Sequence, residues 1–138
     1  PYDVQRFEHE LKIRQPGEPV WSVFQYKNEF APQPLQFILT TKNSTVSQIT
    51  IEIDDFKTVE LDISINKGEN LKYDGGNEVV LYDKSWNRIK GIPMDPGKLN
   101  VSSGDHKIKV HCTFSAKEEA SLKLEIKTAG APEGVAIN

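Results

Sequence analysis

The amino-acid sequence predicts an all-β domain, most simply an antiparallel β-sandwich of jelly-roll-like topology with about nine or ten strands. Three observations lead to this fold class. Much of the chain alternates between apolar and polar residues, turn-forming residues separate the alternating segments, and almost no segment has the composition and length of a helix.

The alternation is clearest in five segments. Successive side chains of a strand point to opposite faces, so each of these segments is expected to form a strand with one buried face and one solvent-exposed face. The segments are 7–14, 49–54, 59–65, 107–114 and 122–127.

Further strands are predicted from runs rich in β-branched and aromatic residues, at 20–26, 35–41, 79–82 and 88–92. Turn signals such as Pro16-Gly17, Asp74-Gly75-Gly76-Asn77 and Ser103-Gly104-Asp105 bound these runs. The stretch Ser115 to Ala120 has helix-forming composition but is too short to hold as a helix alone, so we expect a loop or a single turn. Strands with one wet face must bury the other face against a second sheet, which favours a sandwich; a closed barrel is the alternative.

Composition limits the other classes. The chain has 138 residues, enough for one domain, which we place at 1–129 with a tail or linker at 130–138. A sequence pI of about 5.6 argues against a nucleic-acid binder, and the short apolar runs predict no membrane span. The one cysteine, Cys112, is in phase with the apolar residues of its strand and is expected to be buried. Because the chain starts at Pro1, without Met or a signal-peptide pattern, we expect it to be a piece of something longer.

Three stretches carry a resemblance to known families. Ser103 to Val110 (SGDHKIKV) is similar to the strand that follows a tight glycine turn in jelly-roll carbohydrate-binding modules. The Glu8-x-Glu10 pair resembles the first strand of carbohydrate-binding-module families six and thirty-five. Asn70 to Trp86 looks like the accessory β-sandwich domains at the C-terminal end of bacterial glycoside hydrolases.

The resemblance implies a non-catalytic sugar-binding sandwich. It also implies a structural calcium at Glu8 and Glu10, although no cofactor is required by anything else in the chain. Calcium takes six to eight oxygen ligands, and two strand carboxylates supply too few alone. The alternative is that both glutamates are ordinary solvent-facing residues beside Lys12 and Arg14.

Charge is distributed unevenly along the chain. Residues 47–62 carry five acidic residues and one lysine, whereas residues 84–127 carry nine basic and five acidic residues. If the two late strands share a sheet, their solvent-facing basic residues form one patch that could capture an acidic glycan. The expected members are Lys107, Lys109, His111, Lys123 and Lys127. The alternative is an ordinary solvated sheet face with lysines that protect an edge.

The aromatic residues divide by context. Trp86 lies in a polar turn and Tyr73 lies beside a glycine-rich loop, so both are candidate sugar-stacking residues, with Lys84 and Arg88 as charged neighbours. The alternatives are a tryptophan folded over the sandwich edge and a plain hairpin turn. Trp21, which alternates with Val23, is expected in the core, and the alternative is a ligand platform.

No catalytic signature is present. The chain lacks the nucleophile-elbow, zinc-protease, paired-cysteine and phosphate-loop motifs. His106 and His111 are five residues apart on a predicted strand, so they point to opposite faces and cannot share a metal. His9 is expected to be a hydrogen-bonded core histidine.

These observations favour a carbohydrate-binding module of a larger bacterial polysaccharide-degrading enzyme. The module is expected to be extracellular, cell-surface or periplasmic and to bind an acidic, uronic-acid glycan such as pectin. Its other expected partner is the covalently linked catalytic domain. Three alternatives remain open: a structural module that packs on its catalytic neighbour without binding sugar, an adhesion or protein-interaction sandwich, and, least favoured, an enzyme.

Overall fold

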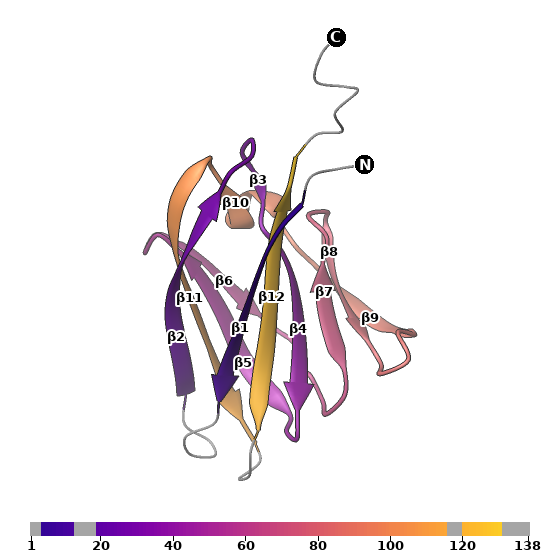
Figure 1. The fold of residues 1–138 in the computed structure, drawn as a ribbon. Helices are drawn as coiled ribbons and strands as arrows, with labels where there is room; N and C mark the ends of the chain where they lie inside the picture. The colour runs from indigo at the N-terminus through magenta and orange to yellow at the C-terminus, as the bar shows by residue number, and fades with distance from the viewer. Residues whose placement is uncertain (1–3, 13–18, 116–119, 131–138) are drawn as a thin grey trace.

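The computed structural model describes residues 4–12, 19–115 and 120–130. In this part of the chain it contains twelve β-strands and one short 3-10 helix, arranged in two packed layers (Figure 1). The prediction of an all-β antiparallel sandwich is therefore confirmed, with slightly more strands than expected. None of the described residues form a helix of the length and apolar character that a bilayer span requires.

The larger layer is a six-stranded antiparallel sheet with the order β1-β12-β4-β7-β8-β9. Its strands are β1 (Val4–Lys12), β12 (Ser121–Ala129), β4 (Gln36–Lys42), β7 (Asn70–Tyr73), β8 (Glu78–Tyr82) and β9 (Arg88–Pro93). The smaller layer has the order β2-β11-β5-β6. Its strands are β2 (Pro19–Asn28), β11 (Gly104–Phe114), β5 (Val46–Ile53) and β6 (Lys57–Leu61). A small pair, β3 (Gln33–Pro34) with β10 (Asn100–Val101), and the helix η1 (Pro96–Leu99) lie at one end of the sandwich.

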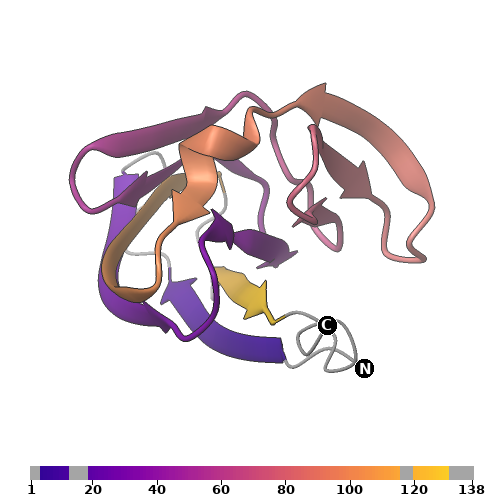
Figure 2. The ribbon, with the colours of Figure 1, turned by 90° about the horizontal axis from the view of Figure 1, so that it is seen from above.

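The order of the strands is that of a jelly roll. The chain crosses between the sheets from β1 to β2, from β2 through β3 to β4, from β4 to β5, from β6 to β7, from β9 through β10 to β11, and from β11 to β12. Sheet β1-β12-β4-β7 therefore faces sheet β2-β11-β5-β6, as in the double Greek-key sandwich. Strands β8 and β9 extend the larger sheet beyond this frame, and Figure 2 shows them on one side of the two layers.

The core lies between the inner faces of the two sheets. Leu39 and Leu124 of the larger sheet and Val110 and Phe114 of the smaller sheet have no exposed surface. Cys112 is buried with them and has no disulfide partner, as expected, and burial raises the pKa of its thiol to about 12.

Strand β2 has the opposite phase from the predicted one. Val20 and Tyr26 point inward and are buried, whereas Trp21 and Val23 are 61% and 55% exposed on the outer face. The expectation that Trp21 lies in the core is therefore wrong. Both phases of this strand carry apolar side chains, so alternation alone did not distinguish its inner face from its outer face.

Other expectations differ in detail. Strand β7 was not predicted, and β6 ends at Leu61, after which Ile65 makes only an isolated bridge to Val46. Residues 116–119 of the expected loop or turn and residues 131–138 of the expected tail lie outside the described residues.

Candidate functional site

The predicted basic patch is not formed as one surface. Lys107, Lys109 and His111 are on β11, whereas Lys123 and Lys127 are on β12, and the two strands belong to different sheets. Because solvent-facing residues point away from the core, the two groups lie on opposite outer faces of the sandwich. The condition on which a single patch depended is therefore not met.

The β11 group is also neutralised by carboxylates of the neighbouring segment. Lys107 Nζ forms an ion pair with Asp55. Lys109 Nζ and His111 Nε2 both lie 3.9 Å from Glu52 Oε2. The acidic segment 47–62 and the basic segment, separated in the sequence, thus meet side by side on β5 and β11.

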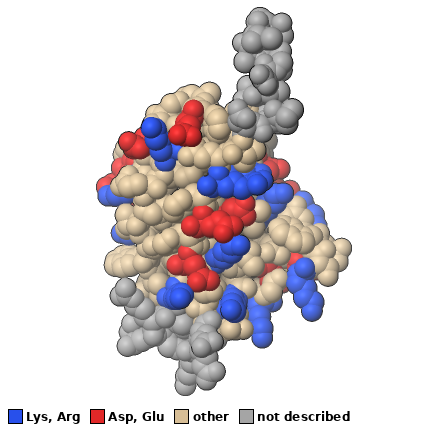
Figure 3. Space-filling view, viewed as in Figure 1, with Lys and Arg blue, Asp and Glu red and all other residues tan. Residues whose placement is uncertain are grey.

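Charges alternate on the outer face of the larger sheet as well. Lys123 Nζ lies 3.4 Å from Glu8 Oε1, and Arg6 Nε lies 3.5 Å from Glu125 Oε1. Lys127 pairs in register with Arg6. Figure 3 shows acidic and basic side chains intermingled over this face. Neither outer face is a uniformly basic surface.

The expected calcium site at Glu8 and Glu10 stays a prediction. Both point to solvent from β1, where Glu8 contacts Lys123 and Glu10 accepts a hydrogen bond of 3.1 Å from Ser121 Oγ. The described residues include no group of three or more His, Cys, Asp and Glu side chains that could hold a metal ion. An ion at these two carboxylates would need further oxygen ligands, because calcium takes six to eight.

Tyr73 is not a surface residue. It has no exposed surface, and its hydroxyl donates a hydrogen bond of 2.9 Å to the carbonyl oxygen of Gly76. It faces the core because it lies on β7, next to Phe37 of β4. Tyr73 therefore supports the loop from below and is not available to a ligand, contrary to expectation.

The β8–β9 turn, by contrast, presents Trp86 on the surface. Asp83 organises this turn: its Oδ1 accepts hydrogen bonds from the backbone N–H groups of Ser85 (2.8 Å) and Asn87 (2.9 Å). The hydrogen bond from Asn87 N–H is the main cause that holds the pKa of Asp83 below its ordinary value. Trp86 has a φ of 62°, and its N–H donates to the carbonyl oxygen of Asp83. A bulky side chain rarely adopts this left-handed conformation, so the turn holds the indole at an energetic cost.

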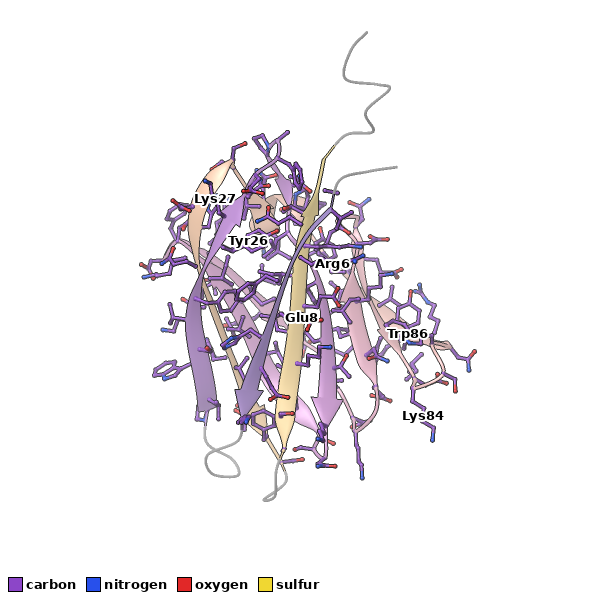
Figure 4. The ribbon with its side chains drawn as sticks, in the orientation of Figure 1. Arg6, Glu8, Tyr26, Lys27, Lys84 and Trp86 are labelled. Atoms are coloured by element: carbon purple, nitrogen blue, oxygen red, sulfur yellow. The ribbon has the colours of Figure 1, made fainter. Side chains whose placement is uncertain are left out.

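The indole of Trp86 forms half of an aromatic surface. Its ring lies 5.4 Å from that of Tyr82, the last residue of β8, and the residue remains 49% exposed. Lys84 projects from the same turn (Figure 4). We refer to Tyr82, Lys84, Trp86 and Arg88 as the hairpin surface.

Arg88 is fixed on this surface by Glu78. Its Nη1 and Nη2 atoms donate to the two carboxylate oxygens of Glu78 at 2.9 and 2.8 Å. The pair lies directly over Gly91, where an added Cβ would come within 2.2 Å of Glu78 Oε2. The hydrogen bonds from Arg88 lower the pKa of Glu78, so both groups remain charged and the guanidinium is held in place.

The structure also brings together Asp54, His106 and Ser102. His106 Nδ1 lies 2.6 Å from Asp54 Oδ2, and Nε2 lies 2.7 Å from the carbonyl oxygen of Ser102 but 3.4 Å from its hydroxyl. A carbonyl oxygen only accepts, so Nε2 carries a proton and cannot act as a base toward the hydroxyl. This group ties the β5–β6 turn to the start of β11 and does not form a nucleophile–base relay.

Tyr82 is the functional candidate that sequence reasoning missed. The signal was available in the turn: Asp83 through Asn87 separates two strands, so Tyr82 and Arg88 must lie opposite each other across the hairpin. His9 and His106 follow expectation. His9 is half-buried and within hydrogen-bond distance of Ser22, and His106 and His111 point to opposite faces of β11.

Comparison with known proteins gave no match of any kind. No protein-family model, no curated protein and no solved structure matches the chain. The interpretation of function therefore depends on the geometry of this chain.

Proposed function

We propose that this domain is a non-catalytic carbohydrate-binding module of a larger polysaccharide-degrading enzyme, and that it binds its glycan at the hairpin surface. The observation that carries the proposal is Trp86: a turn outside the jelly-roll frame holds a half-exposed indole in a left-handed backbone conformation. Backbone strain of this kind concentrates at functional sites. A flat aromatic surface suits the apolar face of a sugar ring.

Lys84 beside the indole favours an acidic glycan. It projects from the turn (Figure 4), whereas Arg88 is already paired with Glu78 through two hydrogen bonds. A uronic-acid chain could stack on Trp86 while its carboxylate pairs with Lys84. The affinity of one such site is expected to be low, and the link to a catalytic domain would raise the effective concentration of the glycan. Such a module would act outside the bacterial cell, on its surface or in the periplasm.

Binding of polygalacturonate tests this proposal. Wild type should bind free polygalacturonate more tightly than its methyl-esterified form, and the difference should shrink with salt because exposed charges are screened. Trp86→Ala should weaken both interactions. Lys84→Ala should weaken only the first, by less than about 1 kcal/mol. Lys98→Ala, in η1, is the matched control and should have no effect.

A second candidate is a structural module that packs on its catalytic neighbour. The observation that favours it is the exposure of Trp21 and Val23 on the outer face of β2. If no glycan on a broad array binds, and a chain with the catalytic domain attached protects this face from solvent, the structural function replaces carbohydrate binding.

A further inference from the structure

A groove runs along the side of the sandwich beneath the β8–β9 hairpin. Its volume is about 1220 Å³. One wall is the outer face of the smaller sheet, with Thr50 of β5 and Glu60 of β6, and the other is the overhanging β8–β9 hairpin, with Ile89 and Lys90. The groove exists because β8 and β9 extend the larger sheet past β6, the last strand of the smaller one.

The lining of the groove includes apolar and polar side chains. Ile89 is 46% exposed, whereas Ile63 and Leu81 are 6% and 4% exposed. The polar side chains carry hydroxyl, amide and carboxylate groups, which donate or accept hydrogen bonds. They include Gln48, Thr50, Glu60, Asp62, Asn66 and Thr113.

An exposed aromatic residue lies at the end of the row of side chains that enters this groove. The register pairs Trp21 with His111, His111 with Thr50, and Thr50 with Glu60, so one row crosses all four strands of the smaller sheet. Three strand spacings separate the first and last members, a span of about 14 Å. His111, Thr50 and Glu60 line the groove, and Trp21 continues the row beyond it.

The indole of Trp21 is held in position although it is 61% exposed. Lys109 Nζ lies 4.4 Å from the ring centroid, and the His111 ring meets the indole edge-on at 6.2 Å. Val23 is exposed beside it on the same strand. The face therefore offers an oriented aromatic platform that leads into a hydrogen-bonding groove.

We propose that this groove, with Trp21 at its end, is a second glycan-binding site, and that it takes an uncharged oligosaccharide chain. The inference rests on the proposed function, because it assumes that the domain recognises sugars. A chain that crosses the four strands would stack one sugar on Trp21 and place the hydroxyls of the following sugars against Thr50 and Glu60. Three carboxylates line the groove, those of Glu60, Asp62 and Glu69, and they outnumber the ammonium group of Lys90. The carboxylate of a uronic acid would therefore be repelled by like charge.

The two sites thus divide the ligands by charge. At the hairpin surface Lys84 can pair with the carboxylate of a uronic acid, whereas Glu60, Asp62 and Glu69 outnumber Lys90 along the groove. Trp21 and Trp86 are the only tryptophans in the chain, so each site has one tryptophan that can be removed.

Titration with defined oligosaccharides tests the second site. The probes are cellohexaose, xylohexaose and mannohexaose as uncharged chains and hexagalacturonate as the acidic chain, each followed by calorimetry and by amide NMR shifts. At least one uncharged hexasaccharide should shift the amides of β5, β6 and β11. Trp21→Ala should weaken its binding about tenfold, the usual scale of one aromatic contact together with its buried area. Trp86→Ala, the matched control, should leave that binding unchanged.

A charge variant sharpens the result. Asp62→Asn combined with Glu69→Gln removes two carboxylates of the groove and leaves Thr50 and Glu60 in place, so it should change uncharged binding less than threefold while allowing hexagalacturonate to shift the groove amides. A circular dichroism spectrum and melting temperature equal to those of wild type would show that each variant is folded.

The outcomes separate the two proposals. Binding of hexagalacturonate at the hairpin, with no uncharged chain bound, overturns the second site and leaves the proposed function standing. Loss of uncharged binding in Trp86→Ala rather than Trp21→Ala also overturns it. Absence of binding by all four hexasaccharides at millimolar concentration overturns both proposals.

Discussion

The two tryptophans are exposed for different structural reasons. Trp86 is in a turn that forces a φ of 62° and is supported by Tyr82 and by the hydrogen bonds to Asp83. Trp21 is in a regular strand at the edge of a sheet, and it is held from the side by Lys109 and His111. Trp86 lowers the stability of the fold through backbone strain, whereas Trp21 does so only through the exposure of an apolar ring. An exposed aromatic platform can therefore arise from a turn or from a strand face.

The structural elements that carry Trp21 and Trp86 also differ. Trp21 belongs to a four-stranded sheet whose far end is tied by the Asp54–His106 pair, with His106 7% exposed. Trp86 belongs to a hairpin outside the jelly roll, with the exposed Glu78–Arg88 pair across its outer side. Changes in the four-stranded sheet should therefore affect the stability of the whole domain, and changes in the hairpin should have only local effects.

The largest effect is expected for Asp54→Asn. The change weakens the hydrogen bond to a buried imidazole and the one from the backbone N–H of Lys107, so the free energy of unfolding should fall by about 2 kcal/mol. Urea denaturation measures it. Asp55→Asn, which removes only an exposed ion pair to Lys107, is the matched control and should cost less than about 1 kcal/mol. Equal effects of the two changes would contradict the conclusion that the hydrogen bonds of Asp54 stabilise the packing of the β5–β6 turn against β11.

The same pair should make stability depend on acid. Partial burial raises the pKa of Asp54, but the hydrogen bonds from His106 and from the Lys107 N–H outweigh it, so the pKa lies below its ordinary value. A carboxyl with a depressed pKa in the folded state stabilises the fold above its unfolded pKa of about 3.9, and this contribution is lost as the pH falls through the folded value. Wild type should therefore lose more stability than Asp54→Asn below about pH 4. Parallel curves for the two proteins would show that Asp54 titrates normally.

An intermediate effect is expected when each tryptophan is replaced by Gly and by Ala. The difference in stability between the Gly and Ala variants should have opposite signs at positions 86 and 21, because only position 86 has a strained backbone. At position 86, Gly should be more stable than Ala by about 1 kcal/mol, because only Gly adopts the left-handed conformation without cost. At position 21, Ala should be more stable than Gly by roughly 0.5–1 kcal/mol, as in any strand interior. Both variants at each position lack the indole, so the effect of losing the ring cancels in the comparison. The same order at both positions would mean that the Trp86 backbone carries no strain.

The smallest effect is expected for Lys109→Met. A cation over an exposed indole contributes roughly 0.5–1 kcal/mol, and the methionine keeps most of the aliphatic contact. In a Trp86→Phe background, Trp21 is the only tryptophan, so the change should alter its fluorescence emission. Lys107→Met, which leaves the Lys109 contact in place, should leave that emission unchanged.

Much of the fold could be predicted from local pattern. The alternation around Ile108 and Val110 and around Leu122 and Leu124 correctly indicated which side chains are buried, because the hydrophobic effect acts on each strand separately. The four-residue strand β7 was missed because three of its four residues are buried, so it shows no clear alternation.

Prediction of the candidate site required knowledge of which strands pair, which the alternation of residues along each strand does not give. Trp86, Lys84 and Arg88 were predicted together because they are neighbours in the sequence around one turn. The grouping of Lys109 with Lys123 was wrong because it required a pairing between β11 and β12 that the jelly-roll crossover prevents. Tyr73 was misplaced because the phase of a strand that was not predicted could not be assigned.

The sequence by itself determined the all-β class, the buried cysteine and the turn that presents Trp86, since each depends on residues within a few positions of one another. Only the tertiary structure decided that the lysines of β11 and β12 face opposite sides, that Trp21 is outside, and that a groove opens beneath the β8–β9 hairpin. The physical reason is that alternation defines two faces for every strand, whereas which face is buried, and against which strand, depends on the packing of the whole chain.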